Sequence, residues 1–343
     1  MDPFTHALTG AAAARLIAAR PLGRAALLPG AVGALLPDAD ALIRSSADPL
    51  LYAEFHRHFT HALAFIPIGG AIAALPWLLQ RRHRPQWRLW LLATTAGYAT
   101  HGVLDACTTW GTRLYWPFTE ARVAWNVISI VDPLFTLILL AGVVLTVRRD
   151  RAGAAAVALA LCAGYLGIGA IQHARASEVQ ARLAAARGHA PARAAVLPGF
   201  TTNLVWRSLY EAGGQVHVDR LRVPWWGEPT WSPGYAHAVT PPKTLVAAAG
   251  GDARIARDLE RFAHFTGGWV AAGLTGETTF GDARYSGSAM TYEPVWGVRL
   301  TGGQPPVAWV DRSRDRRVDA RALLAEVFGR APEHRPVPRA AAP

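Results

Sequence analysis

Histidines and aspartates that are able to bind a metal occur in five short blocks of the sequence. In chain order the blocks are His6; Asp38 and Asp40; His56, His58 and His61; His101 and Asp105; and Asp132. Imidazole and carboxylate are the groups that zinc and similar ions use as protein ligands, and this many together suit a centre of two or three metals. Such a centre activates water for hydrolysis.

The block "HGVLD" has a spacing that favours a shared ligand site. His101 and Asp105 are four residues apart. On a helix both side chains therefore lie on one face, about one turn apart, where they can bind the same metal. A similar argument favours His58 and His61, three residues apart, over His56, which points elsewhere on a helical turn.

Taken one at a time, the other blocks have simpler explanations. Asp38 and Asp40 can end a helix and bond the backbone of a turn. His6 can be a polar cap, and the histidines of 56–61 an interfacial polar cluster. Asp132 precedes a proline and can be only a helix N-cap. The joint occurrence of the blocks, rather than any one of them, predicts the site.

Long apolar runs must position these blocks. Four runs with few or no charges cover residues 62–79, 89–106, 127–147 and 154–171. Each has about 18–21 residues, enough for a helix to cross a hydrocarbon core of roughly 30 Å. Ahead of them, segments 4–19 and 25–36 form either two short spans or a re-entrant hairpin. The sequence therefore predicts an all-α polytopic membrane bundle of about six segments.

The net charge of +11 is placed in a way that indicates membrane topology. Ten arginines fall in alternate loops of the predicted bundle, and the opposite loops hold four. By the positive-inside rule the arginine-rich loops face the cytoplasm, so all five His/Asp blocks face the other side. We expect a multi-pass protein of a bacterial-type inner membrane, with the lipid bilayer and no nucleic acid as partner.

The composition changes after about residue 174. Residues 175–330 contain no membrane-length apolar run, and an alternating pattern that turns at Gly213-Gly214 predicts a β-hairpin. We predict a membrane domain over 1–174, an extracytoplasmic soluble α+β domain over 175–330, and a disordered tail over 331–343. Three tryptophans form either an interfacial belt or part of the second domain's core: Trp225, Trp226 and Trp231.

Five motifs in this order resemble the YdjM-type membrane-bound metal-dependent hydrolases over residues 1 to 150: "MDPFTHALTG", "LLPDAD", "HRHFTHAL", "HGVLDACTTWGTRLYWPF" and "VDPLF". The order of histidines and aspartates is distantly similar to that of zinc-dependent phospholipases C. The resemblance implies a hydrolase whose ligands for two or three zinc ions are His6, Asp38, His58 or His61 or both, His101 and Asp105, with His56 as a further ligand or a neighbour of one. One stretch departs from the family pattern, because "FTEARVAWN" ends in Asn126 where the family often has an acidic residue.

The expected reaction is hydrolysis of a lipid ester or phosphodiester at the membrane surface by metal-activated water. Asp40 or Asp132 is expected to orient that water as general base. Arg57 and Arg113 either hold a substrate phosphate or contact lipid headgroups. The alternatives are a non-enzymatic assembly protein with a structural metal and a metal-ion transporter. A metalloprotease is disfavoured because the sequence has no H-E-x-x-H motif.

Overall fold

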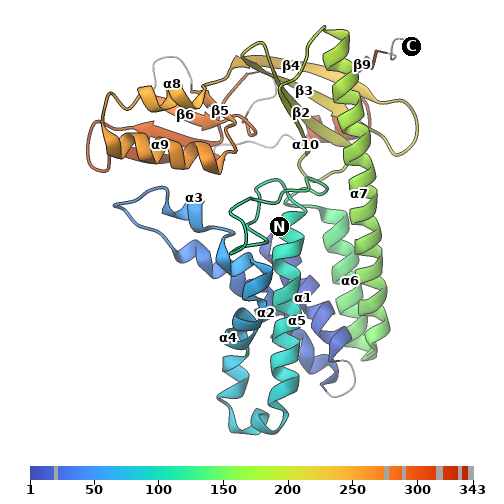
Figure 1. Cartoon of the computed structure of the whole chain (residues 1–343). Coiled ribbons are helices and arrows are strands. Elements are labelled where there is room, and N and C mark those ends of the chain that lie inside the picture. Colours follow the sequence, from blue (N-terminus) through green and yellow to red (C-terminus); the bar gives the residue numbers. More distant parts are fainter. Residues whose placement is uncertain (19–21, 274–277, 288–290, 314–319, 331–333, 339–343) are drawn as a thin grey trace. The chain divides into compact units, whose positions relative to one another are not determined.

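The chain folds into two compact units, which Figure 1 shows as a computed structural model. The structure describes residues 1–18, 22–273, 278–287, 291–313, 320–330 and 334–338. Unit 1 comprises Met1–Ile43, Phe55–Ile171 and Phe200–Asn203, and unit 2 comprises Arg44–Glu54, Gln172–Gly199 and Leu204–Pro343. The sequence placed one boundary after residue 174, whereas the contacts also assign the internal segment 44–54 to unit 2.

Unit 1 is a bundle of α-helices joined by 3₁₀ turns. Its longer helices are α1 (Pro3–Ile17), α2 (Leu27–Leu35), α4 (Ile66–Leu78), α5 (Trp87–Ala106), α6 (Pro133–Arg149) and the first part of α7 (Ala152–Ala186). The shorter elements are η1 (Gly23–Ala26), η2 (Leu36–Leu42), η3 (Phe59–His61), η4 (Leu63–Phe65) and η5 (Arg81–Gln86), whereas α3 (Leu51–Phe55) belongs to unit 2 except for its last residue. The predicted helical bundle at the N-terminal side of the chain is confirmed.

Helix α5 lies at the centre of unit 1 and packs against α1, α2 and α4. Glycines allow this close packing. A Cβ atom on Gly97 of α5 would lie 2.0 Å from the carbonyl oxygen of Gly30 on α2, and one on Gly30 would lie 2.3 Å from that of Gly10 on α1. Small residues at such crossings bring helix backbones into direct contact.

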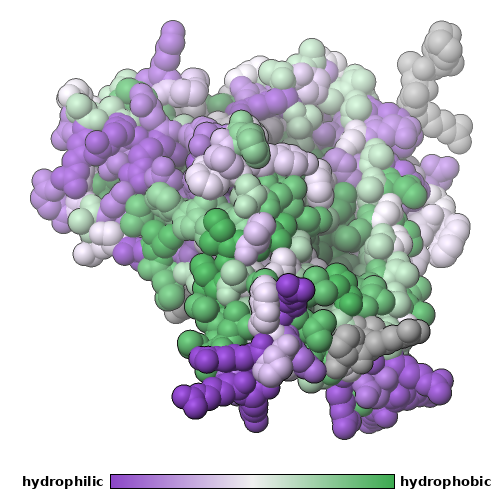
Figure 2. Space-filling model, turned by 60° about the horizontal axis from the view of Figure 1, so that its bottom comes forward, coloured by the Kyte–Doolittle hydropathy of each residue, from purple (hydrophilic) through white to green (hydrophobic). Residues whose placement is uncertain are grey.

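The two ends of unit 1 differ in chemistry. Helices α1 and α5 are antiparallel, since His6 of α1 contacts Asp105 at the end of α5, while Ala14 packs with Trp90 near its start. The histidines and aspartates therefore lie at one end of the helices, and the arginines of η5 lie at the other. Figure 2 shows the arginine end, where a hydrophobic flank gives way to hydrophilic clusters.

Six membrane segments, predicted from the apolar runs, are not supported. Two helical stretches of the described residues are long and apolar enough to cross a membrane, Gly23–Leu42 and Ala152–Ala186. A third is possible if Leu51–His61 and Leu63–Leu78, bent by 60° at their junction, form one broken span. Helix α6 begins only at Pro133 and has 17 residues. Helix α5 is interior, so it tolerates threonines, His101 and Asp105, which lower its mean hydropathy.

Unit 2 contains two antiparallel sheets. The first has strand order β1-β2-β3-β4-β9 and the second β5-β6-β7-β8. The strands are β1 (Arg193–Pro198), β2 (Val205–Ala212), β3 (Gln215–Arg222), β4 (Thr230–Ala238), β5 (Val270–Ala272), β6 (Thr279–Asp282), β7 (Trp296–Leu300), β8 (Val307–Asp311) and β9 (Arg335–Pro336). Its helices are α8 (Pro242–Ala247), α9 (Ala253–Phe265) and α10 (Ala320–Val327). The predicted hairpin joins β2 and β3, with Gly213 and Gly214 at positive φ as a tight turn requires.

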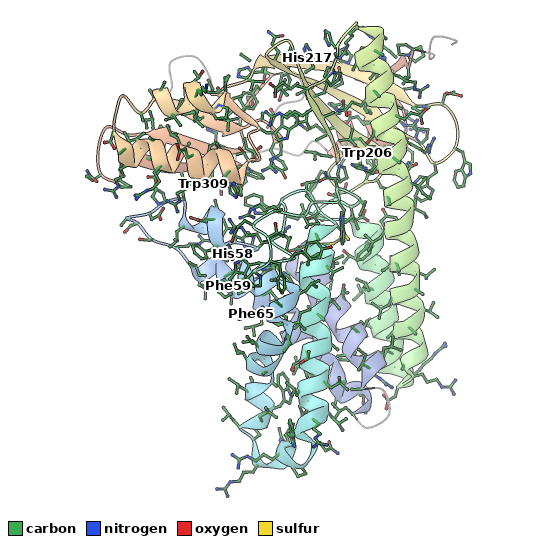
Figure 3. The ribbon with its side chains drawn as sticks, in the orientation of Figure 1. His58, Phe59, Phe65, Trp206, His217 and Trp309 are labelled. Carbon is green, nitrogen blue, oxygen red and sulfur yellow. The ribbon has the colours of Figure 1, made fainter. Side chains whose placement is uncertain are left out.

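The last turns of α7 cover the first sheet of unit 2. Val179 and Leu183 of α7 pack with Trp206, which Figure 3 labels beside this helix, and with Leu221. Trp231 packs against the same cluster, whereas 84% of Trp226 is exposed. Trp231, which is partly buried, therefore packs against the core, and Trp226 does not.

Two features of unit 2 were not expected from the sequence. Part of the predicted disordered tail, Arg335–Pro336, pairs with β4, while residues 331–333 and 339–343 lie outside the described ones. In addition, Arg261 of α9 forms ion pairs with Asp48 and Glu54, which holds segment 44–54 in the unit. Burial alone would lower the pKa of Arg261, but the hydrogen bonds to these carboxylates outweigh it and raise that pKa.

Candidate metal centre

Four pieces of unit 1 bring the predicted metal-binding residues together. They are α1 with His6, η2 with Asp38 and Asp40, the turn and 3₁₀ helix around 56–61, and the last two turns of α5 with His101 and Asp105. The backbone of Arg57 has a positive φ of 62°, so the chain reverses between His56 and His58. Figure 3 labels His58 at this turn and Phe59 and Phe65 just after it.

One group of four residues has the arrangement of a metal site. Ligand atoms of Asp38, His61, His101 and Asp105 all lie within 4.8 Å of one another. Nε2 of His61 is 3.3 Å from Asp105 Oδ2 and 3.5 Å from Asp38 Oδ1. Nε2 of His101 is 3.4 Å from each of the same two oxygens. Ligand atoms bound to one tetrahedral zinc ion are separated by about 3.3 Å, so these distances suit a shared ion.

Three donor atoms of this group form no hydrogen bond among the described residues, although Arg57 Nε lies 3.0 Å from Asp105 Oδ2 as an ion pair. Nε2 of His61, Nε2 of His101 and Oδ2 of Asp105 are buried and accept or donate no hydrogen bond among the described residues. Buried polar atoms are rarely left in this way because each costs about 1–3 kcal/mol. Three such atoms that converge on one point fit a divalent cation. Asp38 completes the group with a side chain that is 28% exposed.

Neighbouring groups fix the imidazoles in the tautomer that a metal needs. Nδ1 of His101 lies 2.5 Å from the carbonyl oxygen of Ala34, to which only a protonated nitrogen can donate. Nδ1 of His61 lies 3.1 Å from Asp40 Oδ2 and 3.0 Å from Thr60 Oγ1. With Nδ1 of both rings protonated, each Nε2 presents its lone pair to the group. Outer hydrogen bonds of this kind orient metal-binding histidines.

A second group, Asp38, Asp40 and His56, shares Asp38 with the first. Its donors are already paired with one another, because Nδ1 of His56 lies 2.9 Å from Asp40 Oδ1. The other oxygen of Asp40 accepts hydrogen bonds from the backbone N–H of Arg57 and from Thr60 Oγ1, both at 2.9 Å. The described residues therefore offer a complete donor set for one ion and a weaker set beside it.

Asp105 is the most heavily contacted carboxylate of the centre. His6 Nε2 lies 3.1 Å from its Oδ1, and the amino group of Met1 forms an ion pair with the same oxygen. The ring of His6 stacks on that of His101 at 3.7 Å. Arg57 Nε lies 3.0 Å from Asp105 Oδ2, and its guanidinium donates to Thr108 Oγ1 at 2.8 Å. His6 thus supports the centre but is in neither group of ligands.

Besides His6 and Arg57, three predicted site residues lie outside both groups: His58, Arg113 and Asp132. Nε2 of His58 accepts a hydrogen bond from Arg113 Nη1 at 2.7 Å, and Arg113 also pairs with Glu120. Asp132 caps α6, since its Oδ1 accepts from Phe135 N at 3.1 Å and its Oδ2 from the Tyr165 hydroxyl at 2.8 Å. Both oxygens of Asp132 are therefore used in holding helices, and His58 faces an arginine.

Sequence reasoning missed three contributors to the centre. Thr60 is part of the motif "HRHFTHAL", but a threonine between histidines gave no separate signal. The carbonyl oxygen of Ala34 has no signal in a sequence at all. Gly102 follows His101, and a Cβ atom there would lie only 2.1 Å from the backbone oxygen of His61. A glycine inside a helix that is otherwise regular was the available clue.

The fold and the centre together define a helical membrane protein with a buried His/Asp cluster at one end of its bundle. The model of the YdjM inner membrane protein family matches residues 1–176, a little more than half of the chain. The chain belongs to this family, as the motifs predicted. No curated protein and no solved structure matches it.

Proposed function

We propose that the protein is a membrane-bound metal-dependent hydrolase that acts on a lipid ester or phosphodiester at the membrane surface. The observation that carries this proposal is the convergence of three buried donor atoms without hydrogen bonds, together with a fourth ligand that is partly open to solvent. A structural metal site has four enclosed ligands, whereas a catalytic site keeps one position open. The exposure of Asp38 favours the second kind.

In this proposal His61, His101 and Asp105 hold one divalent ion, most naturally zinc, and the partly exposed Asp38 is the ligand that water can replace. When bound, the ion polarises the scissile ester and lowers the pKa of a water to about 7. Asp40 and the Ala34 carbonyl keep the two imidazoles in the binding tautomer. The two or three ions that the motifs imply would require the second group as well, and elemental analysis measures their number.

His56 and Asp40 are proposed to act together as the general base. Nδ1–H of His56 donates to Asp40, and this tautomer makes Nε2 the basic nitrogen that would take a proton from the attacking water. The ligand atoms of this pair lie within 4.8 Å of a ligand atom of Asp38, on the open side of the first group. Water supplies the new bond to the acyl carbon or phosphorus, its proton passes to His56, and the leaving alkoxide takes a proton as it departs.

Arg57 is proposed to neutralise charge on the substrate. Its guanidinium is buried and lies beside Asp105 and Thr108, next to the proposed metal ligands. A fixed cation next to a metal stabilises the oxyanion that develops during ester or phosphodiester hydrolysis. We further propose that the arginine-poor end of unit 1, which carries the centre, faces away from the cytoplasm.

The proposal is tested on purified full-length protein by elemental analysis and hydrolysis assays. We expect about one equivalent of zinc and hydrolysis of a chromogenic phosphodiester or a short-chain lipid ester. His61→Ala should remove both, and Asp38→Asn should reduce hydrolysis more than metal content. Tightly bound metal with no hydrolysis of either substrate class would favour the structural-metal alternative. Complete loss of metal from a folded Asp38→Asn variant would argue against an open position at Asp38.

A further inference from the structure

A second feature of unit 1 is a groove between α6 and α7 at the arginine end of the bundle. It has a volume of about 450 Å³. Apolar side chains of both helices line it, including Ile138, Leu145, Val157 and Leu161. Gly142 and Ala158 also line it, at a point where the two helices are in close contact: a Cβ atom on Gly142 would lie 2.3 Å from the Cβ of Ala158. The volume is in the range of small-molecule sites, about 300–1,000 Å³.

Cationic groups lie at the mouth of this apolar groove. Arg149 and Arg151 are part of its lining, and both are exposed. The carboxylate between them, Asp150, is engaged by Arg15, whose Nη2 donates to its backbone oxygen at 3.0 Å and lies 3.3 Å from Oδ1. No carboxylate of the described part of the chain pairs with Arg149 or Arg151. The mouth is therefore net positive.

The start of α7 adds to this positive field. Gly153 and Ala154 line the groove in the first turn of a 35-residue helix that has no acidic residue there. The free N–H groups and the dipole of such a helix end favour an anion. Exposed hydrophobic residues continue along α7, with Val157 59% and Leu161 55% exposed. The lining of the groove is thus apolar along its length and positively charged at one end.

We propose that the groove binds one anionic glycerophospholipid. An acyl chain lies along the apolar lining, and the phosphate accepts charge-assisted hydrogen bonds from Arg149 and Arg151. The lipid is distinct from a substrate, because Arg149, which would hold its phosphate, ends the 17-residue α6 about 25 Å from Asp132 at the other end. It therefore fixes the α6–α7 pair rather than taking part in the reaction.

The test compares binding of two lipids with identical chains, dioleoylphosphatidylglycerol and dioleoylphosphatidylcholine, by native mass spectrometry of the full-length protein in detergent. The wild type is expected to prefer the anionic lipid by roughly tenfold or more. The double variant R149Q/R151Q should lose this preference. R81Q/R82Q, which removes the same charge from η5, should retain it.

A second pair of variants tests whether the groove itself holds the lipid. Gly153 and Gly164 are both exposed on α7, and a Cβ atom at either meets nothing within 4 Å. Only Gly153 lines the groove, so Gly153→Phe should weaken binding of the anionic lipid about tenfold while Gly164→Phe leaves it unchanged. Equal effects of the two arginine pairs would show general surface attraction, and unchanged binding in Gly153→Phe would show that nothing is seated in the groove. Either result overturns the proposal.

Discussion

Substitution of Gly102 by alanine is expected to impair the metal centre without removing a ligand. The new Cβ atom would lie 2.1 Å from the backbone oxygen of His61 and 3.1 Å from its carbonyl carbon. Because both contacts are with backbone, no side-chain rotation relieves them. Segment 58–61 must therefore move by about 1 Å, twice the roughly 0.5 Å to which a functional constellation has to be held.

The size of the effect follows from how His61 is held. Its Nε2 lies within 3.5 Å of Asp38 and Asp105, and its Nδ1 depends on Asp40. A displacement of about 1 Å disturbs all three contacts. We expect zinc affinity to fall at least tenfold and hydrolysis, if the proposed activity is correct, to fall about 100-fold.

The assay is competition for zinc between the purified protein and a chromophoric chelator. Gly164→Ala is the matched control, because it makes the same gain in helix propensity of up to about 1 kcal/mol on an exposed face of α7. Circular dichroism reports whether both variants keep their helices. Wild-type zinc affinity in folded Gly102→Ala protein would refute the reasoning, since it would mean that His61 is free to move without consequence.

Three further outcomes are expected. Asp40→Asn removes the charge that holds two imidazoles and should reduce zinc affinity by about 10–100-fold in the chelator assay. His101→Ala should abolish zinc binding in elemental analysis, whereas His83→Ala, on η5 at the other end of the bundle, should leave it unchanged; equal loss in both would contradict the two-ended arrangement. In thermal unfolding, Trp231→Ala should destabilise the protein by more than 2 kcal/mol and Trp226→Ala by less than about 1, because only the first packs in the core.

The general character of unit 1 was predictable, but the number of spans was not. Hydropathy windows register apolar composition and do not show where a helix begins. Residues 127–132 are apolar enough to extend a predicted span, yet the Asp132 cap and Pro133 start α6 after them. Conversely, α5 is a full 20-residue helix whose polar residues face protein rather than lipid. Its place at the centre of the bundle depends on glycine contacts with α2 and α4 that no periodicity reveals.

The candidate ligands were predicted well where spacing is set by a regular helix and poorly where it is not. His101 and Asp105 meet as expected because α5 is regular between them. For the 56–61 block, helical spacing favoured His58 with His61 and set His56 aside. The positive φ of Arg57 ends any helical relation there, so His56 meets Asp40 while His58 meets Arg113. A left-handed arginine is uncommon and was not foreseeable from residue type.

The two groups differ in how their donor atoms are paired, and this difference indicates which of them could hold a metal. In the second group the imidazole and carboxylate of His56 and Asp40 satisfy each other, so nothing is lost if no ion binds. In the first, the donor atoms of His61, His101 and Asp105 would each carry a desolvation cost of about 1–3 kcal/mol. His101 and Asp105 lie on α5, and α1, α2 and α4 all pack against this helix, so the cost would lower the stability of the bundle. The cation that we propose would satisfy these donor atoms, and its binding would then be part of what stabilises the bundle.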